Sequence, residues 1–297
     1  MSSAVGFIGI GNMGRPMSRN LAAAGFDVTV FDLNVNAARA HADANGLTAV
    51  ETMAGLAGCD RIVTMLPDGK AVRAAMLGEN GAAPHLAAGT LLIDMSSADP
   101  VGTQELGAEL AAKGLAMVDA PVSGAVPRAE DGTLTIMVGS DDPALAERAR
   151  PVLAGMGKEI VQTGPLGSGH AMKALNNYVA ATGFAAVSEA LIVGQKFGLA
   201  PGKMVEIMNT STGRNFMTDL VMKPHVLDEA FATGFALALL SKDVGIAEDL
   251  ASSLDMDARL LHTSAAMWRE ALADLPTGAD NSEAYKAWRD RMSGGAT

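Results

Sequence analysis

The chain has 297 residues, of which 49% are hydrophobic and 19% are charged, so it can fold around two hydrophobic cores. Lys and Arg total 22 against 33 Asp and Glu, which gives a formal net charge of −11. Because such a surface repels phosphate backbones and anionic lipid, we expect neither nucleic acid nor a membrane as a partner. The single cysteine, Cys59, excludes an intrachain disulfide framework and a cysteine-rich zinc site.

The N-terminal apolar stretch of residues 5–10 is broken by glycines and lacks a basic segment before it, so it does not resemble a signal peptide. No uninterrupted apolar run approaches the roughly 18 residues that a membrane span needs. We therefore expect a cytoplasmic protein.

The first half of the chain alternates short β-rich runs with alanine-rich stretches that favour helices. The runs are apolar almost throughout, which is typical of strands buried on both faces. Because strand, helix and strand follow one another, we predict parallel pairing with right-handed crossovers. The expected strands cover residues 5–10, 28–31, 61–66, 90–94, 115–119, 134–138 and 159–162.

From Gly169 onward the sequence predicts helices only. One long helix is expected over residues 170–197, with Gly198 as its C-terminal stop and Pro201 beyond it. Shorter helices are expected over residues 201–209, 241–253, 263–272 and 281–292. The change of character places a domain boundary near residue 165.

A glycine-rich loop follows the first expected strand. Residues 9–14 read Gly9-Ile10-Gly11-Asn12-Met13-Gly14, a G-x-G-x-x-G that opens an expected helix over residues 13–24. Gly9 allows a tight turn, Gly11 lets a pyrophosphate approach the backbone, and Gly14 allows close packing of helix on strand. An ordinary glycine turn is the alternative. The strand and helix around the motif favour a dinucleotide site.

Asp32 ends the second expected strand, 18 positions after Gly14. A carboxylate there accepts hydrogen bonds from ribose hydroxyls and repels a 2′-phosphate. Leu33 and Asn34 follow it, and the first cation is Arg39. The sequence therefore predicts NAD as cofactor rather than NADP, with an ordinary turn aspartate as the alternative.

Other strand ends extend this site. Leu66-Pro67, Ser96-Ser97 and residues 121–124 each follow an expected strand. In a doubly wound sheet these ends line one crevice, where ligands bind. We thus predict an α/β protein: a Rossmann-type doubly wound domain over residues 1–165, a long interdomain helix over 166–198, and an all-α domain for substrate binding and oligomerisation over 166–297.

Lys173 and Asn177 lie four positions apart on the long expected helix and so share a face. Among apolar neighbours, an amine such as that of Lys173 is a candidate acid or base. Judged alone, Lys173 and Lys242 would more often be solvated surface lysines, and His170 an ordinary residue of the helix start. The five histidines show no metal-ligand spacing, so no metal site is predicted.

The order of these motifs resembles the β-hydroxyacid dehydrogenases, a family that includes 3-hydroxyisobutyrate dehydrogenase and tartronate semialdehyde reductase. The resemblance covers about residues 4–255. Two departures, Ala125 where the family often has glycine and Ser97 where it often has threonine, bear on pocket shape. Ala71 replaces an asparagine that often follows the Leu-Pro pair. The matching stretches are residues 6–14, 65–67, 93–97, 119–124 and 167–173, then Asn176-Asn177 and Lys242-Asp243.

The resemblance implies roles for individual residues. Lys173 matches the catalytic lysine, and Lys242 a lysine beside both the nicotinamide and the substrate. Ser123, Gly124 and Asn177 match residues that hold the substrate. The residues matched to cofactor binding are Gly9, Gly11, Asn12, Met13, Gly14, Asp32, Leu66, Pro67, Ser97 and Lys242.

The expected activity is hydride transfer between NAD and a small anionic 3-hydroxy acid, such as 3-hydroxyisobutyrate, or its semialdehyde. A reductase of tartronate semialdehyde or of a sulfonate semialdehyde is the alternative within the family. Imine reductases share the architecture but typically lack the lysine, and 6-phosphogluconate-type enzymes need a larger helical domain. A non-catalytic nucleotide sensor is the alternative of another class. We also expect a homodimer or homotetramer.

Overall fold

The computed structural model describes residues 4–294, and the chain divides into two compact units, Met1–Lys173 and Ala174–Thr297. The first unit is built on one nine-stranded sheet in the order β3-β2-β1-β4-β5-β6-β8-β7, with β9 paired to β8. The strands are β1 (Ala4–Ile8), β2 (Asp27–Phe31), β3 (Thr48–Ala49), β4 (Arg61–Thr64), β5 (Leu91–Asp94), β6 (Ala116–Asp119), β7 (Val122–Ser123), β8 (Leu134–Gly139) and β9 (Gly157–Gly164).

The first six strands of this sheet are parallel, as predicted from their alternation with helices. Their order reverses at β1, which pairs β2 on one side and β4 on the other. In a doubly wound sheet this reversal opens a crevice at the carboxyl ends of the two central strands. The crevice therefore lies where β1 and β4 end, at Ile8 and Thr64.

The prediction of parallel pairing throughout was wrong at β8, which pairs antiparallel with β6 and β7. The cause is the short connection between β7 and β8, which contains one helix of six residues, α5 (Ala125–Glu130). A parallel crossover needs a dozen or more residues, so the chain returns antiparallel. The two shortest strands, β3 and β7, have two residues each and were not expected from the sequence.

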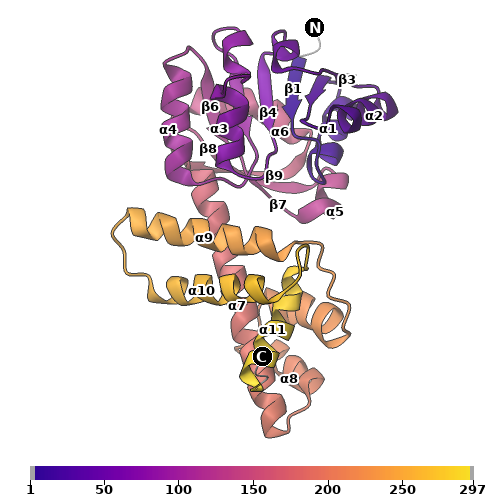
Figure 1. The fold of residues 1–297 in the computed structure, drawn as a ribbon, viewed down its shortest axis with the longest axis vertical. Helices are drawn as coiled ribbons and strands as arrows, with labels where there is room; N and C mark the ends of the chain where they lie inside the picture. Colours follow the sequence, from indigo (N-terminus) through magenta and orange to yellow (C-terminus); the bar gives the residue numbers. More distant parts are fainter. Residues whose placement is uncertain (1–3, 295–297) are drawn as a thin grey trace. The chain divides into compact units, whose positions relative to one another are not determined.

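Helices cover both faces of the sheet (Figure 1). Several begin at a side-chain cap: Asn34, Asp68, Asp99 and Asp142 each accept a hydrogen bond from a first-turn amide. The helical segments of the first unit are α1 (Gly14–Ala23), α2 (Val35–Asn45), η1 (Met53–Leu56), α3 (Gly69–Leu77), η2 (Ala83–His85), α4 (Pro100–Ala111), α5 and α6 (Pro143–Ala154).

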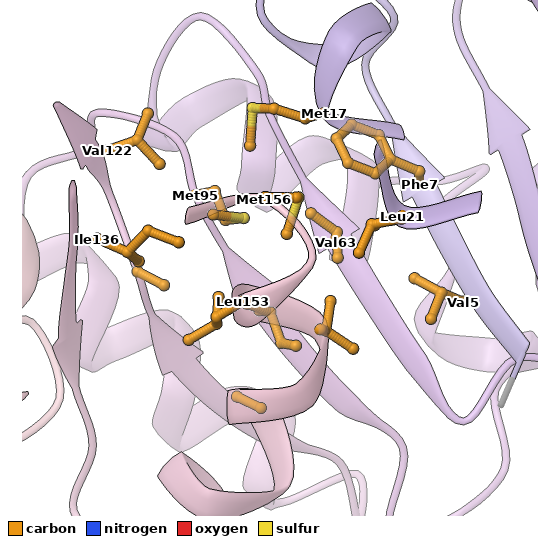
Figure 2. Packing of buried hydrophobic residues seen from close by; sticks show 14 of the residues in the cluster. Val5, Phe7, Met17, Leu21, Val63, Met95, Val122, Ile136, Leu153 and Met156 are labelled. Atoms are coloured by element: carbon orange, nitrogen blue, oxygen red, sulfur yellow. The ribbon is translucent and has the colours of Figure 1, made fainter. Parts of the chain in front are cut away.

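Two apolar clusters fill the space between sheet and helices. On one face, Met17 and Leu21 of α1 and Leu153 of α6 pack against strand residues such as Phe7 and Val63 (Figure 2). On the other face, side chains of α3 and α4 pack against β4 and β5, with Val72, Met76, Leu106, Leu110 and Leu92 among them. Strands covered on both faces explain the unbroken apolar runs in the sequence.

The long helix α7 (Ser168–Phe197) begins in the first unit and continues into the second. It ends as predicted at Gly198, whose φ of +102° is left-handed. The remaining segments are α8 (Pro201–Asn209), the π-helix η3 (Met217–Leu227), α9 (Leu237–Ser253), α10 (Arg259–Asp274), η4 (Asn281–Glu283) and α11 (Ala284–Met292).

The second unit has its own core, around Phe184, Trp268 and Trp288. Their rings contact one another with centroids 5.1 to 6.0 Å apart, and the two tryptophans meet edge to face. Trp268 is fully buried. Such aromatic packing contributes beyond the apolar area that it removes from water.

By length and composition alone, α7 could cross a membrane, although its sequence has no uninterrupted apolar run of that length. Half of its most apolar 18-residue window is buried inside the protein. A long helix at the centre of a soluble protein passes the same test, and the apolar face of α7 contributes Ala181, Phe184 and Leu191 to the core of the second unit.

Candidate functional site

The glycine-rich loop joins β1 to α1 at the crevice. Gly9 has a φ of +103°, and a Cβ on it would stand 2.3 Å from the carbonyl oxygen of Met65. A Cβ on Gly14 would stand 1.9 Å from the carbonyl oxygen of Gly9. A Cβ on Gly11, in contrast, would meet nothing within 4 Å. Gly9 and Gly14 therefore serve the turn and its packing, whereas Gly11 faces open space that a ligand can enter.

The N-terminus of α1 carries no side-chain cap, since the N-cap position holds Met13. Asn12, just before it, is exposed. The first amides of a helix lack intrahelical partners and lie at the positive end of its dipole. These amides are suited to bind a pyrophosphate, as the sequence predicts.

The Asp32 carboxylate lies against this loop. Its Oδ2 accepts a hydrogen bond of 2.7 Å from the amide of Ile10, and its Oδ1 accepts one of 2.8 Å from the amide of Asn34. The side chain is thereby fixed at the edge of the glycine loop, where a ribose of a bound dinucleotide would meet it.

The ends of β4 and β5 are joined by side-chain hydrogen bonds. The hydroxyl oxygen of Ser96 accepts a 3.0 Å bond from the amide of Leu66. Asp94, the last residue of β5, accepts bonds from the Thr64 hydroxyl at 2.8 Å and the Ser96 amide at 3.0 Å. Pro67 and Ser97 are the predicted cofactor contacts next to Leu66 and Ser96. They therefore follow two strand ends that hydrogen bonds hold together.

The predicted substrate loop lies between β7 and α5. Ser123 is the last residue of β7 and pairs with Thr135 of β8. Gly124 has a φ of +134°, and a Cβ on it would stand 2.7 Å from the side chain of Arg128. Ala125 has a φ of +54°, a left-handed conformation that favours glycine. Ala125, which replaces the glycine of the family pattern, therefore has a strained backbone.

The start of α7 is fastened to the sheet by Asp119, the last residue of β6. The Asp119 carboxylate accepts hydrogen bonds from the amides of Gly167 at 2.7 Å and His170 at 2.8 Å. Burial raises the pKa of the Asp119 carboxyl, and the His170 ring and the two amide donors oppose that rise. Lys173 follows His170 by one helical turn and is the last residue of the first unit.

In the second unit, one buried carboxylate connects two predicted substrate residues. Asp243 of α9 is 2% exposed and accepts a 2.6 Å hydrogen bond from Nδ2 of Asn177. The amine of Lys242 lies 3.3 Å from the other carboxylate oxygen of Asp243. The carboxylate therefore orients the amide and compensates the charge of the lysine.

The structure thus gathers the predicted site residues in two groups. The first group lies at or just after strand ends of one sheet in the first unit, and it comprises the glycine loop, Asp32, Leu66-Pro67, Ser97 and Ser123-Gly124. In the second unit, Asn177 and Lys242 meet at Asp243. Sequence reasoning did not select Asp94, Asp119 or Asp243 as site residues, although each stands in a motif that it quoted. Within residues 4–294 no cluster of three His, Cys, Asp or Glu could hold a metal ion.

A doubly wound sheet with an uncapped, glycine-opened helix and a carboxylate at the end of β2 defines an NAD-binding protein. Residues 4–164 match the family described as the NAD binding domain of 6-phosphogluconate dehydrogenase. Residues 167–288 match the family described as NAD-binding of NADP-dependent 3-hydroxyisobutyrate dehydrogenase. The chain belongs to the β-hydroxyacid dehydrogenase family and acts on CH–OH groups or the corresponding carbonyls.

Individual relatives agree with this assignment. The chain is 38% identical to 3-hydroxyisobutyrate dehydrogenase of Pseudomonas aeruginosa over 82% of its own length and 83% of that protein. It is 37% identical to 2-(hydroxymethyl)glutarate dehydrogenase of Eubacterium barkeri, over 82% and 80%. The structure of Mycobacterium tuberculosis 3-hydroxyisobutyrate dehydrogenase with L-serine superposes with a TM-score of 0.89 at 33% identity, over 97% of this chain and 100% of that one.

Proposed function

We propose that the chain interconverts a 3-hydroxy acid of the 3-hydroxyisobutyrate type and its semialdehyde. The single observation that carries the proposal is the place of Lys173, one turn after the residues that fasten α7 to the carboxyl edge of the NAD-binding sheet. That edge is where a doubly wound sheet presents its ligands. The similarity to dehydrogenases named for such substrates supports the proposed substrate class.

The proposal gives each site residue a task. Lys173 is the proton carrier, and Ser123, Gly124 and Asn177 hold the anionic end of the substrate. Lys242 contacts both the substrate and the nicotinamide. The residues proposed to hold NAD are Gly9, Gly11, Asn12, Met13, Gly14, Asp32, Leu66, Pro67 and Ser97.

When bound, NAD supplies the nicotinamide that accepts or returns the hydride. In the oxidation, the unprotonated amine of Lys173 takes the proton of the substrate hydroxyl while that carbon loses its hydride, so the carbonyl forms. In the reduction, the ammonium returns the proton to the carbonyl oxygen. Asn177 is already oriented by Asp243, which reduces the entropy lost when the substrate is placed.

A substrate panel tests this proposal. Purified protein is assayed by NADH absorbance with 3-hydroxyisobutyrate, L-serine, 2-(hydroxymethyl)glutarate, tartronate semialdehyde and a sulfonate semialdehyde. The highest kcat/KM should fall on 3-hydroxyisobutyrate. A higher kcat/KM on tartronate semialdehyde or on the sulfonate semialdehyde would instead identify the chain as a reductase of that substrate. No turnover on the whole panel would refute the proposed substrate class.

Cofactor preference is the first quantitative prediction. Asp32 repels a 2′-phosphate and accepts from ribose hydroxyls, so kcat/KM should favour NAD over NADP by at least about tenfold. The Asp32→Ala variant should bring this ratio closer to one, mainly by lowering kcat/KM with NAD. Steady-state kinetics with both cofactors check the prediction. Equal kcat/KM of the wild type with NAD and NADP would show that Asp32 does not select between the two cofactors.

The second prediction is assembly into a dimer or tetramer. Four methionines of the helical half, Met204, Met208, Met217 and Met222, pack within or against the core of the second unit. Other apolar side chains of that unit are exposed, and Phe197 is 84% accessible. We propose these side chains as contacts of the assembly, since large exposed apolar patches mark interfaces. The exposed set includes Val179, Val193, Phe197, Ile207, Phe216 and Leu220.

Light scattering at micromolar concentration measures the assembly directly. The molar mass should be two or four times that of the 30.3 kDa chain. A variant with Phe197 and Phe216 both changed to Ser should lower that mass, because both side chains are exposed. A wild-type mass equal to one chain would reject the assembly.

A further inference from the structure

We propose that His170 is a positioning residue: its buried ring fixes the first turn of α7, and thereby places the amine of Lys173 against the cofactor edge of the sheet. This inference deepens the proposed function and rests on it for the role of Lys173. His170 lies within the matching stretch of residues 167–173, but the family resemblance assigns it no role.

The ring of His170 has one defined hydrogen bond. Its side chain is fully buried, and Nδ1 lies 2.8 Å from the hydroxyl oxygen of Thr103 on α4. The Thr103 hydroxyl donates its only proton to the carbonyl oxygen of Asp99, at 2.9 Å. The oxygen can therefore only accept from the ring, so Nδ1 carries the proton and donates. This contact joins α7 to α4 across 67 positions of sequence.

Two buried carboxylates flank the same ring. Nε2 lies 3.7 Å from Asp94 at the end of β5, and Nδ1 lies 3.8 Å from Asp119 at the end of β6. Nε2 has no hydrogen-bond partner among the described residues. Since Asp119 also holds the amides of Gly167 and His170, the first turn of α7 is attached through both backbone and side chain.

Asp94, which lies beside the ring, is itself hydrogen-bonded to the cofactor edge. Asp94 accepts from Thr64 and from the amide of Ser96, and the Ser96 hydroxyl oxygen accepts from the amide of Leu66. Hydrogen bonds thus join the proposed cofactor contact Leu66 to Asp94, and the His170 ring, one turn before Lys173, lies 3.7 Å from Asp94 without a hydrogen bond to it. The ring is therefore held by its hydrogen bond to Thr103 and by close packing beside Asp94 and Asp119.

The backbone around the ring has little room to adjust. A Cβ on Gly169 would stand 2.4 Å from the carbonyl oxygen of Met137, and one on Gly167 would stand 2.8 Å from that of Pro100. The helix start is therefore seated directly on β8 and α4. Residues 170 and 173 are neighbours on one helix, so a shift at the ring is carried to the lysine. A misplacement of about 1 Å at a reacting group can cost on the order of 100-fold in rate.

The test compares two substitutions of His170. His170→Asn keeps an N–H donor near the position of Nδ1, whereas His170→Leu keeps the bulk and removes the donor. We expect kcat of His170→Leu to fall by at least about tenfold, with the Kd for NAD unchanged within about twofold, because positioning acts on the reacting centre. His170→Asn should recover kcat to within about threefold of wild type, because the donor is restored.

The control is Ser18→Ala, which removes another fully buried hydroxyl of the first unit, one that donates to the carbonyl of Arg15. It should lower Tm without changing kcat. If His170→Leu fails to fold, Thr103→Val removes the same hydrogen bond from the other side and takes its place, with the same expected fall in kcat.

A second measurement does not depend on the substrate. The rate at which an amine-specific acylating ester modifies Lys173, followed by peptide mass spectrometry, reports the surroundings of the amine. It should change by at least about threefold in His170→Leu and return toward the wild-type value in His170→Asn. A labelling rate and a kcat within about twofold of wild type, beside a lowered Tm, would reduce His170 to a structural role and overturn the inference. Absence of wild-type turnover would instead refute the proposed function. The labelling rate alone would then decide whether His170 positions Lys173.

Discussion

Lys173→Ala should lower kcat by at least about 100-fold, because proton transfer by a placed side chain contributes 10²–10⁴-fold. NAD binding should change little, since the glycine loop and Asp32 hold the cofactor without the lysine. Steady-state kinetics beside a direct NAD titration make the comparison. Turnover within about threefold of wild type would show that another group carries the proton.

Two companion variants sharpen this result. Lys173→Arg should not restore activity, because arginine stays protonated and cannot accept the proton. Lys242→Ala should act mainly on KM, because Lys242 is proposed to hold ligand. Loss of NAD binding in Lys173→Ala would mean that the lysine is structural and that the proton-carrier role must be withdrawn.

Trp268→Ala should destabilise the second unit by about 3–5 kcal/mol, the usual cost of truncating a buried tryptophan. The side chain is fully buried and packs against Phe184 and Trp288. The chain has two tryptophans, Trp268 and Trp288, and both lie in this unit. Urea denaturation followed by the fluorescence of Trp288 therefore measures the unfolding of this unit in the variant.

Trp268→Phe is the matched control. It keeps an aromatic ring and removes Nε1, which has no hydrogen-bond partner in the described structure, so it should cost less than Trp268→Ala. Equal destabilisation by the two substitutions would show that the aromatic ring kept in Trp268→Phe contributes no stability at this position.

Much of the fold follows from patterns within single segments. The buried parallel strands β1, β2, β4, β5 and β6 were expected because their runs are apolar on both faces. The helix α8 matches its predicted bounds, since Pro201 starts it and polar residues end it. The segment η3 was not expected, because a π-helix with Pro224 inside it has no simple periodicity.

The site divides in the same way. The glycine loop and Asp32 could be selected from spacing, because both belong to one strand-helix-strand unit. The contacts of Asp119 with Gly167, of His170 with Thr103 and of Asn177 with Asp243 join residues 48 to 67 positions apart. No local pattern encodes such pairs, since they depend on which strand ends and helices the tertiary fold brings together.

The hydrogen bond from the amide of Ile10 to Asp32 couples cofactor choice to the integrity of the glycine loop. A substitution that removes the side-chain oxygen, such as Asp32→Ala, would leave this amide without its acceptor, and an unpaired buried donor costs about 1–3 kcal/mol. Such a substitution would therefore lower the stability of the glycine loop at the same time as it removes the repulsion of the 2′-phosphate. Asp32→Asn or Asp32→Ser, which keep an acceptor oxygen while removing the charge, are the changes through which laboratory evolution of the coenzyme preference should begin.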